Sequence, residues 1–218
     1  MARIELLAHR GWWNAPAERN TLAVLERAFK EGMGVETDIR DCCGEIVISH
    51  DPPMPGSLSL RKVLESYASA GKPGWLALNV KSDGLQNGVQ SLLKEFGIDH
   101  YFLFDMSIPD AMQWIRAGMT IFSRQSDVEP QPVLYDHCAG VWADGFSTDW
   151  IGLSFLKTHL AAGKSIGVIS PEIHGRDPRH LWQLLKELAG IQTGSASPAL
   201  MLCTDLIPEA RRYFYGEN

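Results

Sequence analysis

The sequence predicts an α/β protein built as a (β/α)8 TIM barrel, in a single catalytic domain over residues 1–218. Short apolar segments alternate with amphipathic segments along the chain and form eight strand-then-helix units. At 218 residues and 45% hydrophobic content, the chain is long enough for one such barrel and its core. No Pro-, Gly- or Ser-rich linker divides it. A doubly wound open parallel sheet is the alternative fold for this alternation.

The first half of the chain supplies four of these units. An apolar run at residues 4–8 predicts the first strand. Asn20 is the expected N-cap of a helix over 21–31, whose apolar residues recur at helical spacing, and Gly32 ends that helix. By the same criteria we expect strands at 35–40, 75–80 and 101–104, an extended segment at 45–49, and helices at 59–70, 85–96 and 108–117.

The second half repeats the pattern with shorter segments. Asp177-Pro178 is a typical start for the helix at 181–189. The helix expected at 132–138 and the strand expected at 140–143 are the least regular elements. The other expected strands lie at 120–123, 166–170 and 199–203, and the other helices at 153–162 and 208–215.

Charge and composition exclude several classes of protein. A net charge of −6 without a basic patch argues against a nucleic-acid partner. No apolar run reaches the roughly 18 residues of a membrane span, and the N-terminus lacks the features of a signal peptide. We therefore expect a cytoplasmic protein with no integral membrane segment. The four cysteines show no C-x-x-C spacing, which favours reduced thiols and argues against a zinc site.

Polar residues follow or end the apolar strands. In a barrel, the carboxyl ends of the strands carry the active site, so these residues are expected to gather at one end. Those that end or follow the strands are His9, Arg10, His50, Asp51, Asn79, Lys81, Asp105, Arg124, Asp144, Glu172, His174 and Asp205.

Glu36 and Asp38 are the most informative pair because they stand two residues apart in a predicted strand. Their side chains therefore share one face, which in a barrel strand is the interior. Two carboxylates in a core repel each other and are poorly solvated, and a hard divalent cation resolves that conflict. The alternatives are a solvent-facing pair, or a pair neutralised by Arg40 on the same face.

Several short motifs occur together in a fixed order. They are His9-Arg10-Gly11, Arg19-Asn20-Thr21, Glu36-x-Asp38 and His50-Asp51-Pro52, and a Thr204-Asp205 pair follows at the last strand. This combination resembles the glycerophosphodiester phosphodiesterase family, which belongs to the phospholipase-C-like phosphodiesterases and has a barrel fold.

The resemblance implies a role for each matching residue. His9 and His50 would be the general acid and base, Arg10 and Lys81 would hold the phosphate, and Glu36 and Asp38 would bind Mg²⁺ or Ca²⁺. It further implies a metal-dependent hydrolase that cleaves a small glycerophosphodiester to an alcohol and a phosphomonoester, with a place in lipid metabolism.

Two departures from the family pattern stand out. Asn79 occupies the position of the usual third carboxylate ligand, and an amide oxygen can ligate a hard cation but carries no charge. We expect Glu172 to supply the missing charge, and His174 or Arg176 to contact substrate. The alternative is an ordinary polar loop there. Arg19 stands where the family usually has Glu, and helix capping by Asn20 is the simpler explanation for that segment.

Two other functions stay open. A divergent barrel would bind a phosphorylated ligand without turnover, although such a binder has no need of two histidines. A metal-dependent amidohydrolase typically has an H-x-H motif on its first strand, and this chain has none. The sequence carries no information on oligomeric state.

Overall fold

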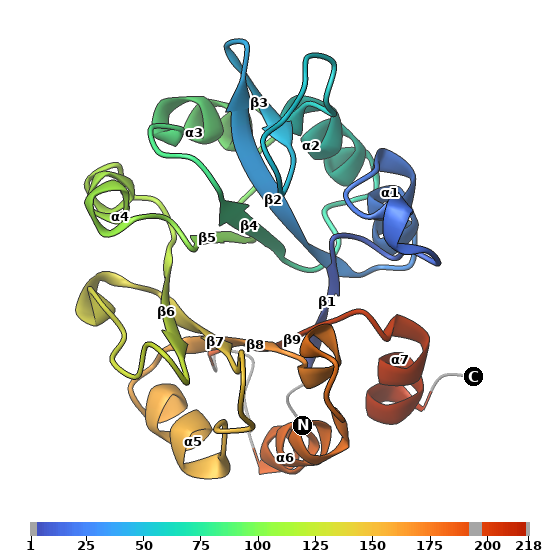
Figure 1. The fold of residues 1–218 in the computed structure, drawn as a ribbon, viewed down its shortest axis with the longest axis vertical. Coiled ribbons are helices and arrows are strands. Elements are labelled where there is room, and N and C mark those ends of the chain that lie inside the picture. Colours follow the sequence, from blue (N-terminus) through green and yellow to red (C-terminus); the bar gives the residue numbers. More distant parts are fainter. Residues whose placement is uncertain (1–3, 192–197, 217–218) are drawn as a thin grey trace. The chain divides into compact units, whose positions relative to one another are not determined.

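The structure is a computed structural model that describes residues 4–191 and 198–216. The chain divides into two compact units. One unit is Leu7–Ile121, and the other joins residues 4–6 to the described residues after 121. Strands and helices alternate in both units (Figure 1). The expectation of one domain over 1–218 stays a prediction.

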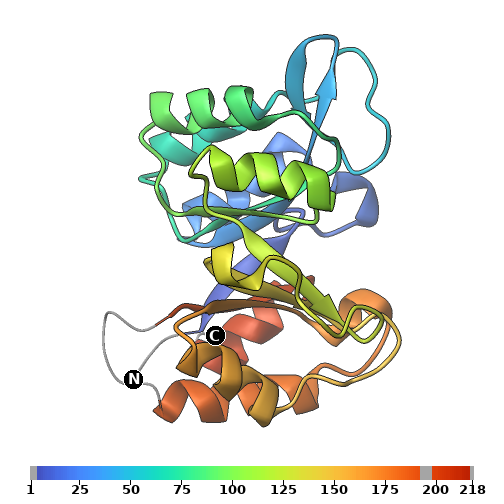
Figure 2. The ribbon, with the colours of Figure 1, turned by 90° about the vertical axis from the view of Figure 1, so that its left-hand side faces the viewer.

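The unit Leu7–Ile121 contains four parallel strands in the order β5-β4-β2-β1. A short strand, β3, pairs antiparallel with β2 and forms a hairpin that extends beyond the other strands of the unit (Figures 1 and 2). The elements are β1 (Glu5–His9, from Leu7 onward in this unit), η1 (Pro16–Glu18), α1 (Leu22–Lys30), β2 (Gly34–Cys42), β3 (Glu45–Ile48), α2 (Leu60–Ser69), β4 (Leu76–Val80), α3 (Gln86–Glu95), β5 (Tyr101–Phe104) and α4 (Ile108–Arg116).

The other unit has four parallel strands in the order β9-β8-β7-β6. Helices α5 and α6 lie on one side of this sheet (Figure 1). The elements are β6 (Phe122–Ser126), η2 (Tyr135–His137), β7 (Gly140–Asp144), α5 (Leu153–Ala161), β8 (Ser165–Ile169), η3 (Pro171–His174), α6 (Arg179–Ile191), β9 (Leu200–Thr204) and α7 (Ile207–Tyr215).

Most predicted elements lie within two residues of the observed ones. The helix predicted at 132–138 is wrong, because the chain makes only the 3-10 turn η2 there. Leu134 has a left-handed backbone with φ +57°, which interrupts a continuous right-handed α-helix. The strand predicted at 120–123 is shifted, since β6 begins only at Phe122.

Buried apolar side chains hold helices against the strands and against each other. Phe29 of α1 packs edge-on against Tyr67 of α2, with ring centroids 5.2 Å apart. In α4, Trp114 is fully buried and donates its indole N–H to the buried Asp110 at 2.7 Å.

None of the described helices is long and apolar enough to cross a membrane. The cytoplasmic location stays a prediction.

The turn of the β2–β3 hairpin has an unusual residue. Cys42 pairs with Glu45, so Cys43 and Gly44 form a two-residue loop with φ values of +51° and +84°. Positive φ at both positions defines a type I′ turn, in which Asn, Asp and Gly are the usual residues. A cysteine in this conformation destabilises the turn by about 1 kcal/mol.

We therefore expect Cys43→Asn to raise the free energy of unfolding by about 0.5–1 kcal/mol, because Asn tolerates the left-handed region. Urea unfolding at fixed pH measures this difference. Cys42→Ser is the matched control, since Cys42 ends a regular strand and should show no gain. Equal or lower stability of the Asn variant would contradict the assignment of strain to Cys43.

Candidate active site

Two residues with left-handed backbone shape the turn that ends β1. Arg10 has φ +55° and Gly11 has φ +91°. A Cβ atom on Gly11 would lie 2.6 Å from Val24 Cγ2 and 2.9 Å from the Val24 carbonyl carbon, so only glycine fits. The Arg10 amide donates to the Glu36 carbonyl at 2.9 Å. The turn thereby holds His9 and Arg10 next to β2.

The carboxylate of Asp38, in β2, is completely buried and meets charged groups from several elements. Arg10 Nε lies 3.2 Å from Asp38 Oδ2, and Asn20 Nδ2 donates to the same oxygen at 2.9 Å. Lys81 Nζ lies 3.6 Å from the other oxygen, Oδ1, and 3.8 Å from Asp105 Oδ2. Two cations thus offset the buried charge of Asp38.

Asn20 does not cap helix α1, contrary to the sequence prediction. The N-cap is Thr21, and Asn20 has a left-handed backbone with φ +61°. Its side-chain amide donates to Asp38 and accepts a hydrogen bond from Thr37 Oγ1 at 2.8 Å. Its backbone N–H donates to the Arg10 carbonyl. Asn20 is therefore a site residue that positions Asp38, because its amide group satisfies buried polar groups of β2.

Glu36 and Asp38 are both buried, at 2% and 0% exposure, which excludes a solvent-facing pair. Burial and the neighbouring Asp38 carboxylate raise the pKa of Glu36 from 4.5 to about 7. His9 Nε2 lies 3.9 Å from Glu36 Oε2. Glu36 consequently holds a proton in the native state up to near-neutral pH, unless a bound cation displaces that proton.

Three buried oxygen atoms in the described part of the chain have no hydrogen-bond donor: Glu36 Oε2, Asp38 Oδ1 and Asn79 Oδ1. Asn79 of β4 is the register partner of Asp38, so the three side chains come from adjacent strands. Oxygen-rich sets of this kind suit Mg²⁺ or Ca²⁺. Within residues 4–191 and 198–216, no cluster holds three or more His, Cys, Asp or Glu placed for a metal. The set formed by Glu36, Asp38 and Asn79 consists of two carboxylates and one amide.

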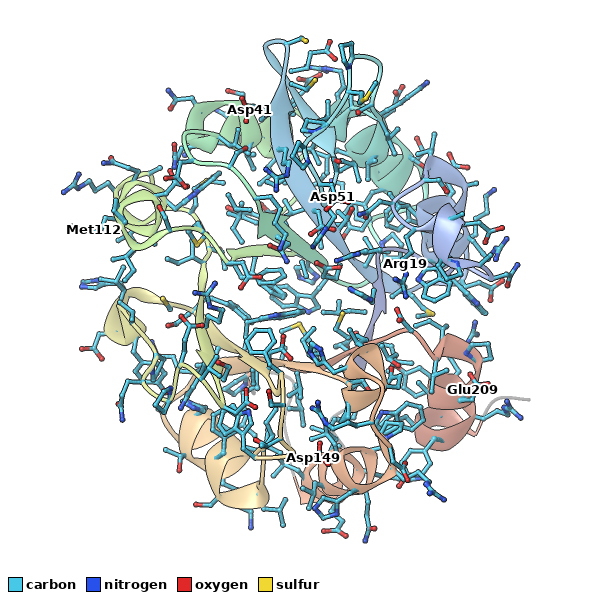
Figure 3. The ribbon with its side chains drawn as sticks, viewed as in Figure 1. Arg19, Asp41, Asp51, Met112, Asp149 and Glu209 are labelled. Atoms are coloured by element: carbon cyan, nitrogen blue, oxygen red, sulfur yellow. The ribbon has the colours of Figure 1, made fainter. Side chains whose placement is uncertain are left out.

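His50 lies on the surface, just after β3, and is held from two sides. Its Nδ1 lies 2.9 Å from Asp51 Oδ1, and Asp51 is labelled in Figure 3. The hydrogen bond from His50 lowers the pKa of Asp51. Arg40 donates from Nε and Nη2 to the His50 carbonyl, at 3.1 and 3.0 Å. Arg40 therefore orders the segment that carries His50, and none of its hydrogen bonds is to Glu36 or Asp38.

Glu172, in the other unit, accepts hydrogen bonds from three neutral donors. These are the hydroxyls of Ser170 and Thr204 and the backbone amide of Asp205, the last at 3.1 Å. Both carboxylate oxygens are thus occupied. A role for Glu172 as a metal ligand stays a prediction, and it would require these contacts to be shared or exchanged.

His174 and Arg176 take part in different contacts. His174 Nε2 lies 2.7 Å from Oδ1 of the buried Asp144, at the end of β7, and forms a His-Asp pair. Arg176 donates to Asp149 at 3.0 Å and to two backbone carbonyls of the loop after β7. Arg176 therefore uses most of its guanidinium N–H groups to hold that loop. The His174 side chain is 24% exposed and can be reached from solvent.

The structure brings together six residues proposed from the sequence within the unit Leu7–Ile121. Sequence analysis names Asn20 and Arg40 but does not predict what they contact. Asn20 binds Asp38 instead of capping a helix, and Arg40 binds the His50 carbonyl instead of the carboxylates. The spacing of residue types gives no signal for a bond to a backbone carbonyl. The six are His9, Arg10, Glu36, Asp38, Asn79 and Lys81.

Comparison with known proteins bears on the fold. No family model and no curated protein sequence matches the chain. Among solved structures, a glycerophosphoryl diester phosphodiesterase from Parabacteroides distasonis has a TM-score of 0.69 at 12% identity, covering 99% of this chain and 87% of that one. A phosphodiesterase from Oleispira antarctica, solved with the product sn-glycerol-3-phosphate, has a TM-score of 0.65 at 16% identity and 96% coverage of both chains.

A glycerophosphodiester phosphodiesterase from Agrobacterium tumefaciens str. C58 is similar at a TM-score of 0.64 and 18% identity, covering 93% of this chain and 96% of that one. The fold is a (β/α)8 barrel, as in these phosphodiesterases. The predicted fold class is confirmed, and the predicted resemblance is confirmed at the level of fold. Because one fold supports many reactions, activity has to be argued from the site.

The raised pKa of Glu36 predicts a pH-dependent stability in chelator-treated protein. Between pH 4.5 and about 7 the native carboxyl keeps its proton while the unfolded one loses it. The native state then binds more protons, so stability falls as pH rises through this window and levels off above it. Glu36→Gln should remove this component, which is on the order of 1–3 kcal/mol.

The measurement is the difference in unfolding free energy between Glu36→Gln and wild type at pH 5 and pH 8, with EDTA present. Relative to wild type, the free energy of unfolding of Glu36→Gln should be higher at pH 8 than at pH 5. Glu95→Gln serves as the control, because Glu95 is an exposed carboxyl paired with Arg61. A difference that is constant with pH would mean that Glu36 has an ordinary pKa.

Proposed function

We propose that this chain is a metal-dependent phosphodiester hydrolase. It cleaves a small glycerophosphodiester, or a related phosphodiester, into an alcohol and a phosphomonoester. The observation that carries the proposal is the set of three donor-free buried oxygens on Glu36, Asp38 and Asn79, next to the cations Arg10 and Lys81. Such a set combines a place for a cation with a place for an anion.

Glu36, Asp38 and Asn79 would hold Mg²⁺ or Ca²⁺ through these oxygens. When bound, the ion polarises the phosphoryl oxygens and offsets the charge that develops on them. Asn79 is favoured as the third ligand because its Oδ1 has no donor, whereas both oxygens of Glu172 already accept hydrogen bonds. Glu172 is the alternative for this position.

Arg10 and Lys81 would bind the phosphate group. Each lies near Asp38 and keeps about a fifth of its side chain exposed, so its remaining N–H groups can reach a ligand. A guanidinium offers a planar pair of donors to phosphate oxygens, and an ammonium offers a compact charge. Asp38 and Asn20 hold the Arg10 side of this site in place.

His9 and His50 would transfer protons during cleavage. One histidine gives a proton to the leaving alcohol oxygen, and the other takes a proton from the attacking hydroxyl or water. Asp51 holds His50 Nδ1 and leaves Nε2 for proton transfer. His9 sits at the end of β1 beside Glu36.

We assign His174, supported by Asp144, to contact with the alcohol part of the substrate, and Arg176 to holding the adjacent loop. The Oleispira antarctica enzyme of the same fold was solved with sn-glycerol-3-phosphate, which supports a phosphomonoester product. Binding of a phosphorylated ligand without turnover is the competing function, and it remains because Asn79 brings no charge.

Substitution of either proton-transfer histidine tests the reaction. We expect His9→Ala and His50→Ala each to lower kcat by about 10²–10⁴-fold, with KM changed less, because general acid–base catalysis contributes about that much. The measurement is release of sn-glycerol-3-phosphate from glycerophosphodiesters, and of nitrophenol from bis(p-nitrophenyl) phosphate, with Mg²⁺ or Ca²⁺ present.

His137→Ala is the matched control, since His137 is an exposed histidine of η2 and should leave the rate unchanged. Binding of sn-glycerol-3-phosphate without measurable turnover by wild-type protein under all metal conditions would favour the competing function. Full activity of both histidine variants would exclude the proposed mechanism.

Metal binding should depend on pH through Glu36. A cation has to displace the Glu36 proton, so Mg²⁺ or Ca²⁺ should raise the Tm more at pH 8 than at pH 6, with proton release on binding. Affinity should fall by up to about tenfold per pH unit below the pKa. Thermal unfolding with and without EDTA, and calorimetry in two buffers, measure these effects.

Three variants decide which residue is the third ligand. Asn79→Asp should tighten metal binding and Asn79→Leu should weaken it, while Glu172→Ala should leave the affinity unchanged if Asn79 is the ligand. The opposite pattern, with loss of affinity in Glu172→Ala alone, would assign the position to Glu172.

A further inference from the structure

The tip of the β2–β3 hairpin carries two adjacent cysteines whose sulfur atoms touch. Cys42 Sγ lies 3.9 Å from Cys43 Sγ, although neighbouring side chains of a strand point to opposite faces. The left-handed backbone of Cys43 brings its side chain to the side of Cys42. The strained turn described above is therefore what joins the two thiols.

Both thiols are accessible, unlike the other two cysteines of the chain. Cys42 is half-buried and Cys43 is exposed, whereas Cys138 and Cys203 are buried in the other unit. The hairpin extends away from the remaining strands of its unit (Figure 1), and Asp41, which precedes Cys42, is labelled in Figure 3. A reagent in solution can thus reach two sulfurs at once only at this hairpin, within the described residues.

We propose that Cys42 and Cys43 form a dithiol binding site for trivalent arsenicals. In this reaction a hydrated arsenoxide, R–As(OH)2, loses two As–O bonds and gains two As–S bonds. Each thiol proton leaves with a hydroxyl group as water, and arsenic stays trivalent, so no oxidant or reductant is needed. Because the second bond forms within one molecule, the pair retains the ligand far better than two separate thiols.

The charges around the pair favour condensation of the thiols with an arsenoxide over reactions that start from a thiolate. Desolvation and the contact with Cys43 raise the pKa of the Cys42 thiol, and the Asp41 and Glu45 carboxylates act in the same direction. The Cys42 thiol therefore keeps its proton more readily than an ordinary cysteine, which slows reagents that need a thiolate at this sulfur. Condensation with an arsenoxide releases water and starts from the protonated thiols.

The test uses phenylarsine oxide and the intact mass of the folded chain. Wild-type protein should take up one phenylarsine per chain, lose two water molecules per hydrated reagent, and keep the adduct in excess β-mercaptoethanol. A dithiol such as 1,2-ethanedithiol should remove it. Cys42→Ser and Cys43→Ser each retain one accessible thiol, and their adducts should be lost to β-mercaptoethanol at least about tenfold faster.

Cys43→Asn is the second variant, because it suits the turn and keeps the hairpin folded while it removes one sulfur. The double variant Cys42→Ser/Cys43→Ser should form no adduct. An adduct in this variant would show that one of the buried thiols, Cys138 or Cys203, reacts. Circular dichroism checks that every variant is folded. A wild-type adduct that β-mercaptoethanol removes readily, or one that persists in folded Cys43→Asn, would overturn the proposal.

Discussion

The buried carboxylate of Asp38 is the constraint on which the candidate site depends. A charge without solvent contact needs nearby cations and hydrogen bonds, and these come from the turn after β1, the segment before α1 and the residue after β4. Arg10, Asn20 and Lys81 are each oriented by this requirement. The tight turn at Gly11 makes the arrangement possible, since a larger residue would collide with α1.

The hairpin formed by β2 and β3 connects the buried and the exposed parts of the site. Its first strand carries the buried carboxylates and ends at Cys42, next to the exposed Cys43, while its second strand leads to His50. Arg40 joins the two arms by donating to the His50 carbonyl. One continuous element therefore carries both the buried carboxylates of the core and an exposed histidine, His50, which we propose as a proton-transfer group.

The polar groups of the two units differ in how far their hydrogen bonds are satisfied. Glu172 and the His174–Asp144 pair have partners within their own unit. Glu36, Asp38 and Asn79 instead each have a buried oxygen without a donor, a costly state for a stable core. The cost is consistent with a binding site, because a ligand can supply what the protein lacks. This contrast, rather than the fold shared with enzymes at 12–18% identity, is the basis for the proposed chemistry.

The sequence by itself determined the alternation of strands and helices, the shared inward face of Glu36 and Asp38, and the glycine at the turn after His9. These features depend on local periodicity and backbone freedom, which neighbouring residues control. The tertiary structure alone decided that Asn20 holds Asp38 instead of capping α1, that Arg40 binds the His50 carbonyl, and that the sulfurs of Cys42 and Cys43 meet. Such contacts depend on which segments pack together and on individual φ angles, and neither is encoded in the spacing of residue types.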